Sequence, residues 1–144
     1  MRLDINSVNP DAYKAVLGME MYARTHNDPQ LYELVKLRAS MVNGCGFCVD
    51  MHSADALKAG EPSRRLFAVS AWREATQLFT DREQAAFALT DAVTRLGEHG
   101  VPDDVWDEAA RHFTTEELGN LLMAIVTINV WNRLAISTKQ ELPA

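Results

Sequence analysis

The sequence is poor in cysteine, with two among 144 residues, and it has neither a run of basic residues nor a long uninterrupted apolar run. Two cysteines are too few for the disulfide framework of a small secreted domain. A net charge of −6 and a pI near 5.1 make nucleic acids and anionic membrane surfaces poor partners. The longest apolar stretch, 121–136, is interrupted by Asn129, Asn132 and Arg133, so we expect no membrane span.

The first residues also lack the apolar segment of a signal peptide, which predicts a cytoplasmic protein. In that reducing compartment a closely spaced cysteine pair is more often catalytic than structural. Alternation of apolar and polar residues at strand spacing is missing, and so is any internal repeat. The sequence therefore predicts an all-α protein, with residues 1–144 forming a single helical bundle of six to seven helices.

Helix-capping signals and apolar residues at helical spacing place these helices along the chain. Seven helices are expected to begin at or just after Asn9, Pro29, Gly44, Ser63, Thr80, Pro102 and Thr114. In the first of them we expect Leu17 and Met21 to belong to the stripe that packs inward. Residues 1–8 are expected to be extended, and the segment Trp72–Phe79 is expected to be a loop.

The two cysteines form one Cys45-Gly-Phe-Cys48 motif, and His52 follows Cys48 by one helical turn. Asn43-Gly44 signals the end of a helix, so both cysteines are expected on the first turn of the next one. The free backbone N–H groups and the dipole at that position favour a thiolate, which is the reactive form of cysteine. Because residues i and i+4 share a helix face, His52 faces Cys48 and is the candidate base.

Glu33, on the preceding helix, is the candidate group that orients His52. At 1.5 Å per residue, Glu33 lies roughly 16 Å before the Asn43-Gly44 turn and His52 roughly 12 Å after it. These heights nearly match in an antiparallel pair of helices. The helical hairpin that carries the cysteine motif is therefore expected to bring Glu33 close to His52.

Three interpretations of the motif stay open at this point. The favoured one is a dithiol redox site, since a disulfide that closes so small a loop stabilises the fold very little. A second interpretation makes Cys45, Cys48 and His52 metal ligands, but no second cysteine pair completes a tetrahedral set, and we expect no metal or cofactor. In the third, the cysteines are small buried residues beside an incidental histidine, and Glu33 is a solvated helix charge.

The stretch from Glu33 to His52 (ELVKLRASMVNGCGFCVDMH) resembles the alkylhydroperoxidase D (AhpD)-like branch of the carboxymuconolactone decarboxylase family. The segments 60–61, 71–74 and 129–135 add to this resemblance, which covers most of the chain. One departure is visible, because AhpD proteins can carry a histidine just before the second cysteine, where this chain has Phe47.

The resemblance implies a function and a role for each residue of the motif. Cys48 matches the cysteine that attacks a hydroperoxide, and Cys45 matches its proton donor and resolving partner. His52 and Glu33 match a proton relay. The implied activity is that of a thiol-dependent hydroperoxide reductase, reset by an external dithiol of the thioredoxin-like or lipoyl type.

Two alternatives to this function are retained. One is a decarboxylase-like or isomerase-like enzyme that uses Glu33 and His52 as acid–base groups. The decarboxylase branch of the family lacks the cysteine pair, so Cys45 and Cys48 argue against that alternative. The other is a redox-sensing oligomer without turnover.

The last predicted helix is apolar on more faces than one chain of this size can cover. Its inner residues can fill the chain's own core, which leaves Met123, Val130, Trp131 and Ile136 without cover. Exposed apolar patches of this kind usually mark an interface. Since the resembled family forms trimers and hexamers, we expect a homo-oligomer, a trimer or a hexamer.

Overall fold

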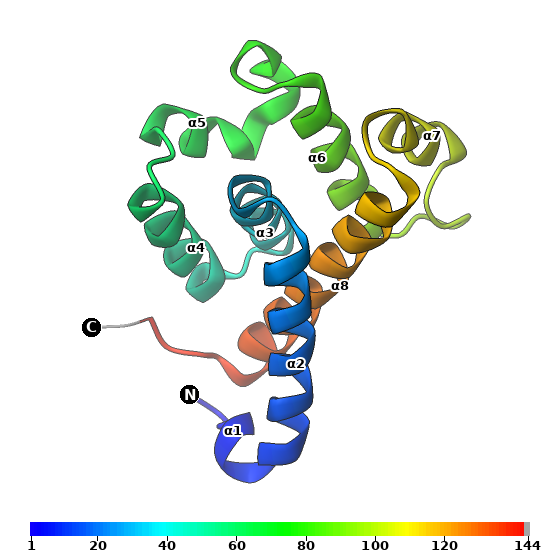
Figure 1. Cartoon of the computed structure of the whole chain (residues 1–144). Coiled ribbons are helices and arrows are strands. Elements are labelled where there is room, and N and C mark those ends of the chain that lie inside the picture. The colour runs from blue at the N-terminus through cyan, green and yellow to red at the C-terminus, as the bar shows by residue number, and fades with distance from the viewer. Residues whose placement is uncertain (143–144) are drawn as a thin grey trace.

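The structure, a computed structural model, describes residues 1–142, and within this range every regular element is a helix. The predicted all-α class is therefore confirmed (Figure 1). The α-helices are α1 (Ile5–Val8), α2 (Pro10–His26), α3 (Pro29–Asn43), α4 (Gly46–Lys58), α5 (Ser63–Ala68), α6 (Asp81–Thr94), α7 (Asp103–His112) and α8 (Thr115–Thr138). Two 3-10 helices, η1 (Val69–Glu74) and η2 (Thr76–Leu78), connect α5 to α6.

Two expectations about individual segments are wrong. Residues 5–8 are helical instead of extended, because the carboxylate of Asp4 accepts hydrogen bonds from the Asn6 backbone N–H at 3.0 Å and from the Ser7 hydroxyl at 2.5 Å. With α1 added, the described residues hold eight α-helices where six or seven were expected.

The segment Trp72–Phe79 is the other exception, since η1 and η2 cover most of it. Trp72 and Phe79 are both buried and pack against Phe87 of α6, with ring centroids 5.7 and 5.1 Å apart from it. This contact with a distant helix orders a segment that carries no helix periodicity of its own.

Helix α3 lies in the middle of the molecule, with α2, α4, α6 and α8 around it (Figure 1). It is buried on nearly all sides: Leu34, Val35 and Leu37 are fully buried, and so are the polar residues Lys36 and Ser40. Removing the apolar side chains of α3 from water is a main driving force of the fold. Polar side chains on α3 are consequently held in the interior.

Helix α8 is long and apolar enough to cross a membrane by length and composition, a test that the core helix of a globular protein also passes. In this fold α8 packs against α2, α3 and α6. Its buried Asn132 donates to the Ser40 hydroxyl at 3.0 Å and accepts from the Asn43 amide at 2.9 Å. These bonds join α8 to the end of α3, directly before the cysteine motif.

The turn between α3 and α4 is made by Gly44, whose φ of +69° places it in the left-handed region. Residues other than glycine are strained there, so the predicted helix stop at Asn43-Gly44 is confirmed with its physical cause. The Gly44 and Cys45 N–H groups donate back to carbonyls at the end of α3. Helix α4 then runs back along α3, and the two form the expected hairpin.

Candidate redox site

Both cysteines lie at the N-terminus of α4, as expected. Cys45 is the N-cap residue and Cys48 lies in the first turn, and both side chains are buried. Their Sγ atoms are 2.6 Å apart, and both cysteines are free. The thiols are therefore in direct contact, and a disulfide between them requires no movement of the backbone.

The contact between the two thiols shifts their pKa values in opposite directions. The hydrogen bond with Cys48 stabilises the Cys45 thiolate, and although burial opposes this, the pKa of Cys45 is lowered to about 7. The same hydrogen bond, together with burial and the nearby charge on Cys45, raises the pKa of Cys48. The first proton to leave the pair therefore leaves Cys45, and this ionisation takes place around neutral pH. Sequence reasoning had placed the reactive thiolate on Cys48.

A pH titration of the thiolate absorbance in the ultraviolet checks this arrangement. We expect one thiolate per chain to form with a midpoint near pH 7, because Cys48 donates to Cys45. In Cys48→Ala the donor is lost, and the midpoint should move toward the free-thiol value of about 8.5. Cys48→Ser is the matched control, since its hydroxyl can still donate. Equal midpoints in the alanine and serine variants would contradict the proposed contact.

Glu33 and His52 come together as the hairpin predicts. Glu33 Oε2 lies 3.3 Å from His52 Nδ1, and His52 is only 4 % exposed. Burial alone would raise the pKa of Glu33, but the contacts with His52 and Lys36 outweigh burial and lower it. Glu33 is therefore an ionised carboxylate beside the imidazole at neutral pH, where it can hold the ring orientation and stabilise a proton on it.

Lys36 and Glu20, which the sequence analysis did not single out, continue the row of charged groups that begins with His52 and Glu33. Lys36 is 1 % exposed, and its Nζ lies 3.0 Å from Glu33 Oε1 and 3.5 Å from Glu20 Oε1. Glu20, on α2, also accepts hydrogen bonds from the Tyr32 hydroxyl at 2.6 Å and the Trp131 indole N–H at 3.1 Å. The sequence does contain a signal for the Glu33–Lys36 contact, because Lys36 follows Glu33 by three residues on the same helix and stands between apolar residues.

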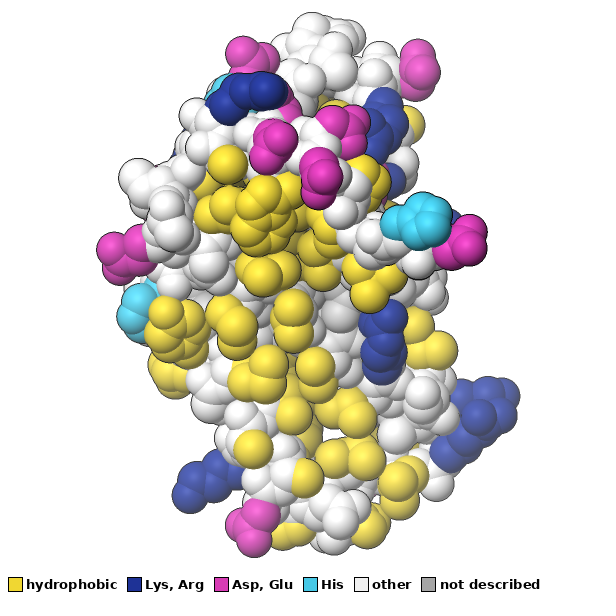
Figure 2. Space-filling view, turned by 90° about the vertical axis from the view of Figure 1, so that its right-hand side faces the viewer, with side chains coloured by type: hydrophobic (Ala, Val, Ile, Leu, Met, Phe, Trp, Pro, Cys, Tyr) yellow, Lys and Arg dark blue, Asp and Glu magenta, His cyan; other side chains and the backbone are white. Residues whose placement is uncertain are grey.

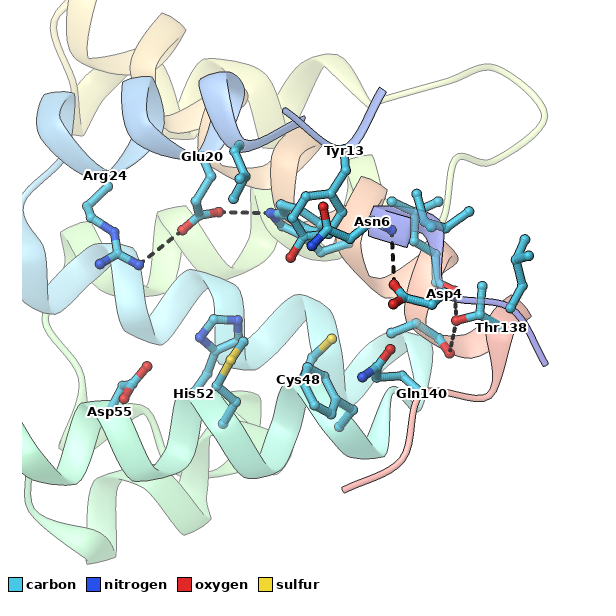
Figure 3. A pocket seen from close by; sticks show the side chains of 18 residues that line it. Asp4, Asn6, Tyr13, Glu20, Arg24, Cys48, His52, Asp55, Thr138 and Gln140 are labelled. Atoms are coloured by element: carbon cyan, nitrogen blue, oxygen red, sulfur yellow. Dashed lines mark hydrogen bonds and ion pairs between the residues drawn. The ribbon is translucent and has the colours of Figure 1, made fainter. Parts of the chain in front are cut away.

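A cavity of about 390 Å³ opens beside the thiols. Cys48 and His52 line it, whereas Cys45 and Glu33 do not. Figure 3 shows Cys48, His52 and Asp55 on the α4 side and Glu20 and Arg24 across from them on α2. The apolar side chains of the wall are Leu3, Ile5, Tyr13, Leu17, Phe47, Met51, Trp131, Leu134 and Ala135. Of the two cysteines, Cys48 is therefore the one that a small organic molecule in this cavity can contact.

The sequence places this fold and site in a known family. The model of the carboxymuconolactone decarboxylase family matches residues 10–92, which is more than half of the chain. The chain belongs to this family. The matched segment contains α2, α3 and α4, and so all four predicted site residues.

Relatives in this family match to different extents. The uncharacterized protein YdfG of Bacillus subtilis is 34 % identical over 137 residues, covering 94 % of this chain and 92 % of YdfG. The alkyl hydroperoxide reductase AhpD of Coxiella burnetii is 41 % identical over 46 residues, which cover 32 % of this chain and 26 % of AhpD. The likeness to that enzyme is therefore local.

Solved structures extend the comparison to the whole fold. A protein of unknown function from Agrobacterium tumefaciens, with a suggested assignment as an antioxidant defence protein AhpD, superposes with a TM-score of 0.95. It shares 37 % sequence identity, and the match covers 99 % of this chain and 98 % of that one. This chain is thus an AhpD-like member of the carboxymuconolactone decarboxylase family.

A second solved structure, the debrominase Bmp8, shares the fold with a TM-score of 0.83 but only 20 % identity. That match covers 94 % of this chain and 73 % of the debrominase. The same helical scaffold therefore carries more than one chemistry, and the activity of each member has to be argued from its site.

Proposed function

We propose that this AhpD-like protein is a thiol-dependent hydroperoxide reductase. The observation that carries the proposal is the contact between the Cys45 and Cys48 sulfurs at the N-terminus of α4, with Cys48 on the wall of a cavity. A dithiol in this position can be ionised, can react with a molecule in the cavity and can close to a disulfide. The local likeness to alkyl hydroperoxide reductase AhpD supports the same chemistry.

The reaction begins with the shared thiol proton. The Cys45 thiolate accepts the proton of Cys48, which leaves Cys48 as the thiolate that faces the cavity. Cys48 Sγ attacks one peroxide oxygen, the O–O bond breaks, and the leaving alkoxide takes up a proton to become an alcohol. Cys48 is then a sulfenic acid, so the sulfur has been oxidised by two electrons and the peroxide reduced by two.

Cys45 completes the chemistry within the chain. Its sulfur attacks the Cys48 sulfenic acid, a disulfide forms, and the hydroxyl group leaves as water after taking the Cys45 proton. An external dithiol, of the thioredoxin-like or lipoyl type, then reduces the disulfide by thiol–disulfide exchange and is itself oxidised. This dithiol is the partner that the proposal requires.

His52 and Glu33 supply the proton pathway in this scheme. His52 lines the cavity together with Cys48, so it can deliver a proton to the leaving alkoxide. Glu33, ionised and 3.3 Å from His52 Nδ1, holds the imidazole in place and can stabilise the proton that the ring passes on. Glu33 acts through His52, since it does not line the cavity.

Titration of free thiols before and after exposure to one equivalent of an organic hydroperoxide tests the proposal. We expect both thiols of each chain to disappear with the peroxide and to return after addition of a dithiol. The doubly substituted Cys45→Ser/Cys48→Ser protein is the control for uncatalysed peroxide loss. Retention of both thiols would reject the reductase and favour acid–base chemistry by Glu33 and His52, or a role without turnover.

We also propose that the chain forms a homo-oligomer. Figure 2 shows a long apolar stripe over the face formed by α2, α7 and α8. On α2, Leu17 and Met21 are exposed, so the expectation that they pack inward is wrong. Leu17 lines the cavity, which leaves Met21 as the residue of this pair that is available for a subunit contact. On α8, Met123 and Val130 are only half-buried and Ile136 is 45 % exposed. A surface of this kind is typical of a subunit contact.

Trp131 differs from the other residues expected to lie in that contact. It packs edge-on against Tyr13 of α2, with ring centroids 5.3 Å apart, and it donates to Glu20. The chain itself therefore covers much of this indole.

Light scattering at micromolar concentration tests the assembly. We expect a mass of three or six times the 16.1 kDa of one chain, because the exposed apolar side chains on α2 and α8 gain cover from a second copy. Met21→Glu, which places a charge on this surface, should lower the mass, whereas Arg64→Glu, an exposed change on α5, should not. A mass near that of one chain would contradict the proposed oligomer.

A further inference from the structure

Glu33, His52 and Asp55 place three potential metal ligands around one point. One ligand atom from each residue lies within 4.8 Å of the other two. His52 and Asp55 are three residues apart on α4 and share a helix face, and Glu33 reaches the same point from α3. Figure 3 shows His52 and Asp55 projecting from α4 on the same side.

Two of these ligand atoms are buried and contact each other. His52 Nδ1 and Glu33 Oε2 form an ion pair at 3.3 Å, and neither atom has an aligned hydrogen bond to any other described residue. Buried polar atoms normally use their full hydrogen-bonding capacity. An ion placed between these two atoms would be a partner for both of them.

The separation of the two atoms matches a metal site. Zn²⁺ binds imidazole nitrogen and carboxylate oxygen at about 2.0–2.2 Å, which sets the edge of the coordination tetrahedron near 3.3 to 3.5 Å. The observed distance of 3.3 Å between Nδ1 and Oε2 is such an edge. Asp55 is 45 % exposed and lines the cavity, so an ion can enter from that side and retain water as its fourth ligand.

The surrounding charges are compatible with a divalent cation. Lys36 contacts Oε1 of Glu33, so Oε2 remains available to His52 and to an ion, as happens when an outer group orients a ligating carboxylate. The charge of Lys36 is offset by Glu20, 3.5 Å away. Arg24, 3.5 Å from Glu20, and Lys58, 3.8 Å from Asp55, are both largely exposed, so water and salt screen their charges. The carboxylates of Glu33 and Asp55 therefore still favour a divalent ion.

We propose that Glu33, His52 and Asp55 bind a divalent transition-metal ion of the Zn²⁺ type, independently of the two cysteines. This site does not depend on the proposed peroxide chemistry. The ion occupies the same His52 and Glu33 atoms that the proton pathway uses, so metal binding and proton transfer exclude each other.

The test measures Zn²⁺ binding in competition with a chromogenic chelator, using untagged Cys45→Ser/Cys48→Ser protein. Removing both thiols eliminates the obvious competing ligands. We expect one Zn²⁺ per chain and a rise in the melting temperature with Zn²⁺ concentration. Absence of saturable binding to this cysteine-free protein would overturn the proposal, whether or not the native chain reduces peroxides.

Two matched aspartate variants in the same background locate the ion. Asp55→Asn should weaken Zn²⁺ binding by about 10-fold or more, because an amide is a poorer ligand than a carboxylate. Asp50→Asn, an exposed change on the same helix, should leave the affinity within about twofold. Equal weakening in the two variants would show non-specific attraction by the acidic surface and overturn the assignment. Glu33→Gln on α3 tests a second ligand in the same way and should also weaken Zn²⁺ binding.

Discussion

Replacing Cys48 by serine is expected to lower the rate of peroxide reduction by more than about 1,000-fold, because a serine hydroxyl cannot replace the thiolate nucleophile. Cys48 is chosen over Cys45 because it is the cysteine that lines the cavity. The measurement is steady-state consumption of an organic hydroperoxide in the presence of an excess of dithiol. Asp50→Ala, an exposed change on α4, is the control and should keep the native rate.

Cys45→Ser should behave differently from Cys48→Ser. With Cys48 still present, the chain should consume about one equivalent of peroxide and then accumulate a sulfenic acid, since no second thiol can close the disulfide. A sulfenic-acid trap followed by mass measurement detects this state at Cys48.

The reverse pattern would reassign the two roles. Cys45 has the lower pKa, about 7, so acidity alone would favour it as the nucleophile, whereas access from the cavity favours Cys48. A sulfenic acid in Cys48→Ser together with an inactive Cys45→Ser would show that acidity decides the reaction. Native turnover in Cys48→Ser would reject the mechanism altogether.

Lys36→Met is expected to destabilise the fold by about 3–5 kcal/mol at pH 7, as measured by urea denaturation. The change keeps most of the apolar stem of Lys36 but removes the ammonium group that lies between Glu20 and Glu33. Two largely buried carboxylates then lose the cation between them, and Glu20 keeps only the exposed Arg24. The double variant Lys36→Met/Glu20→Gln should recover a large part of the loss, because one of the two charges is gone.

The pH dependence distinguishes this mechanism from a simple packing defect. Burial raises the pKa of Glu20, but Tyr32 and Lys36 outweigh burial and lower it, as His52 and Lys36 do for Glu33. A carboxyl group with a lowered pKa in the folded state stabilises the protein above its ordinary pKa of 4.5, and this stabilisation is lost as the pH falls through the folded value. The difference in the free energy of unfolding between the native protein and Lys36→Met should therefore become smaller below about pH 4.5. A packing defect would give a difference that does not change with pH.

The sequence alone determined the helical hairpin and the arrangement of the cysteine motif on it. Asn43-Gly44 ends α3 because Gly44 adopts a positive φ, which is a property of that single residue. The spacing along two straight helices then brings Glu33 and His52 to the same height, and their atoms do lie 3.3 Å apart. Such predictions hold because they depend on neighbours within one turn of helix and on one short connection.

Only the tertiary structure decided what surrounds that motif. Glu20 on α2 contacts Lys36, and Asn132 on α8 donates a hydrogen bond to Ser40 near the end of α3. No local pattern in the sequence predicts either contact. The segment 72–79 is ordered by packing on Phe87. The low pKa of Cys45 depends on the rotamers that bring two sulfurs together inside the protein. In each case the deciding energy is the burial and pairing of side chains from distant segments, which exists only once the helices have packed.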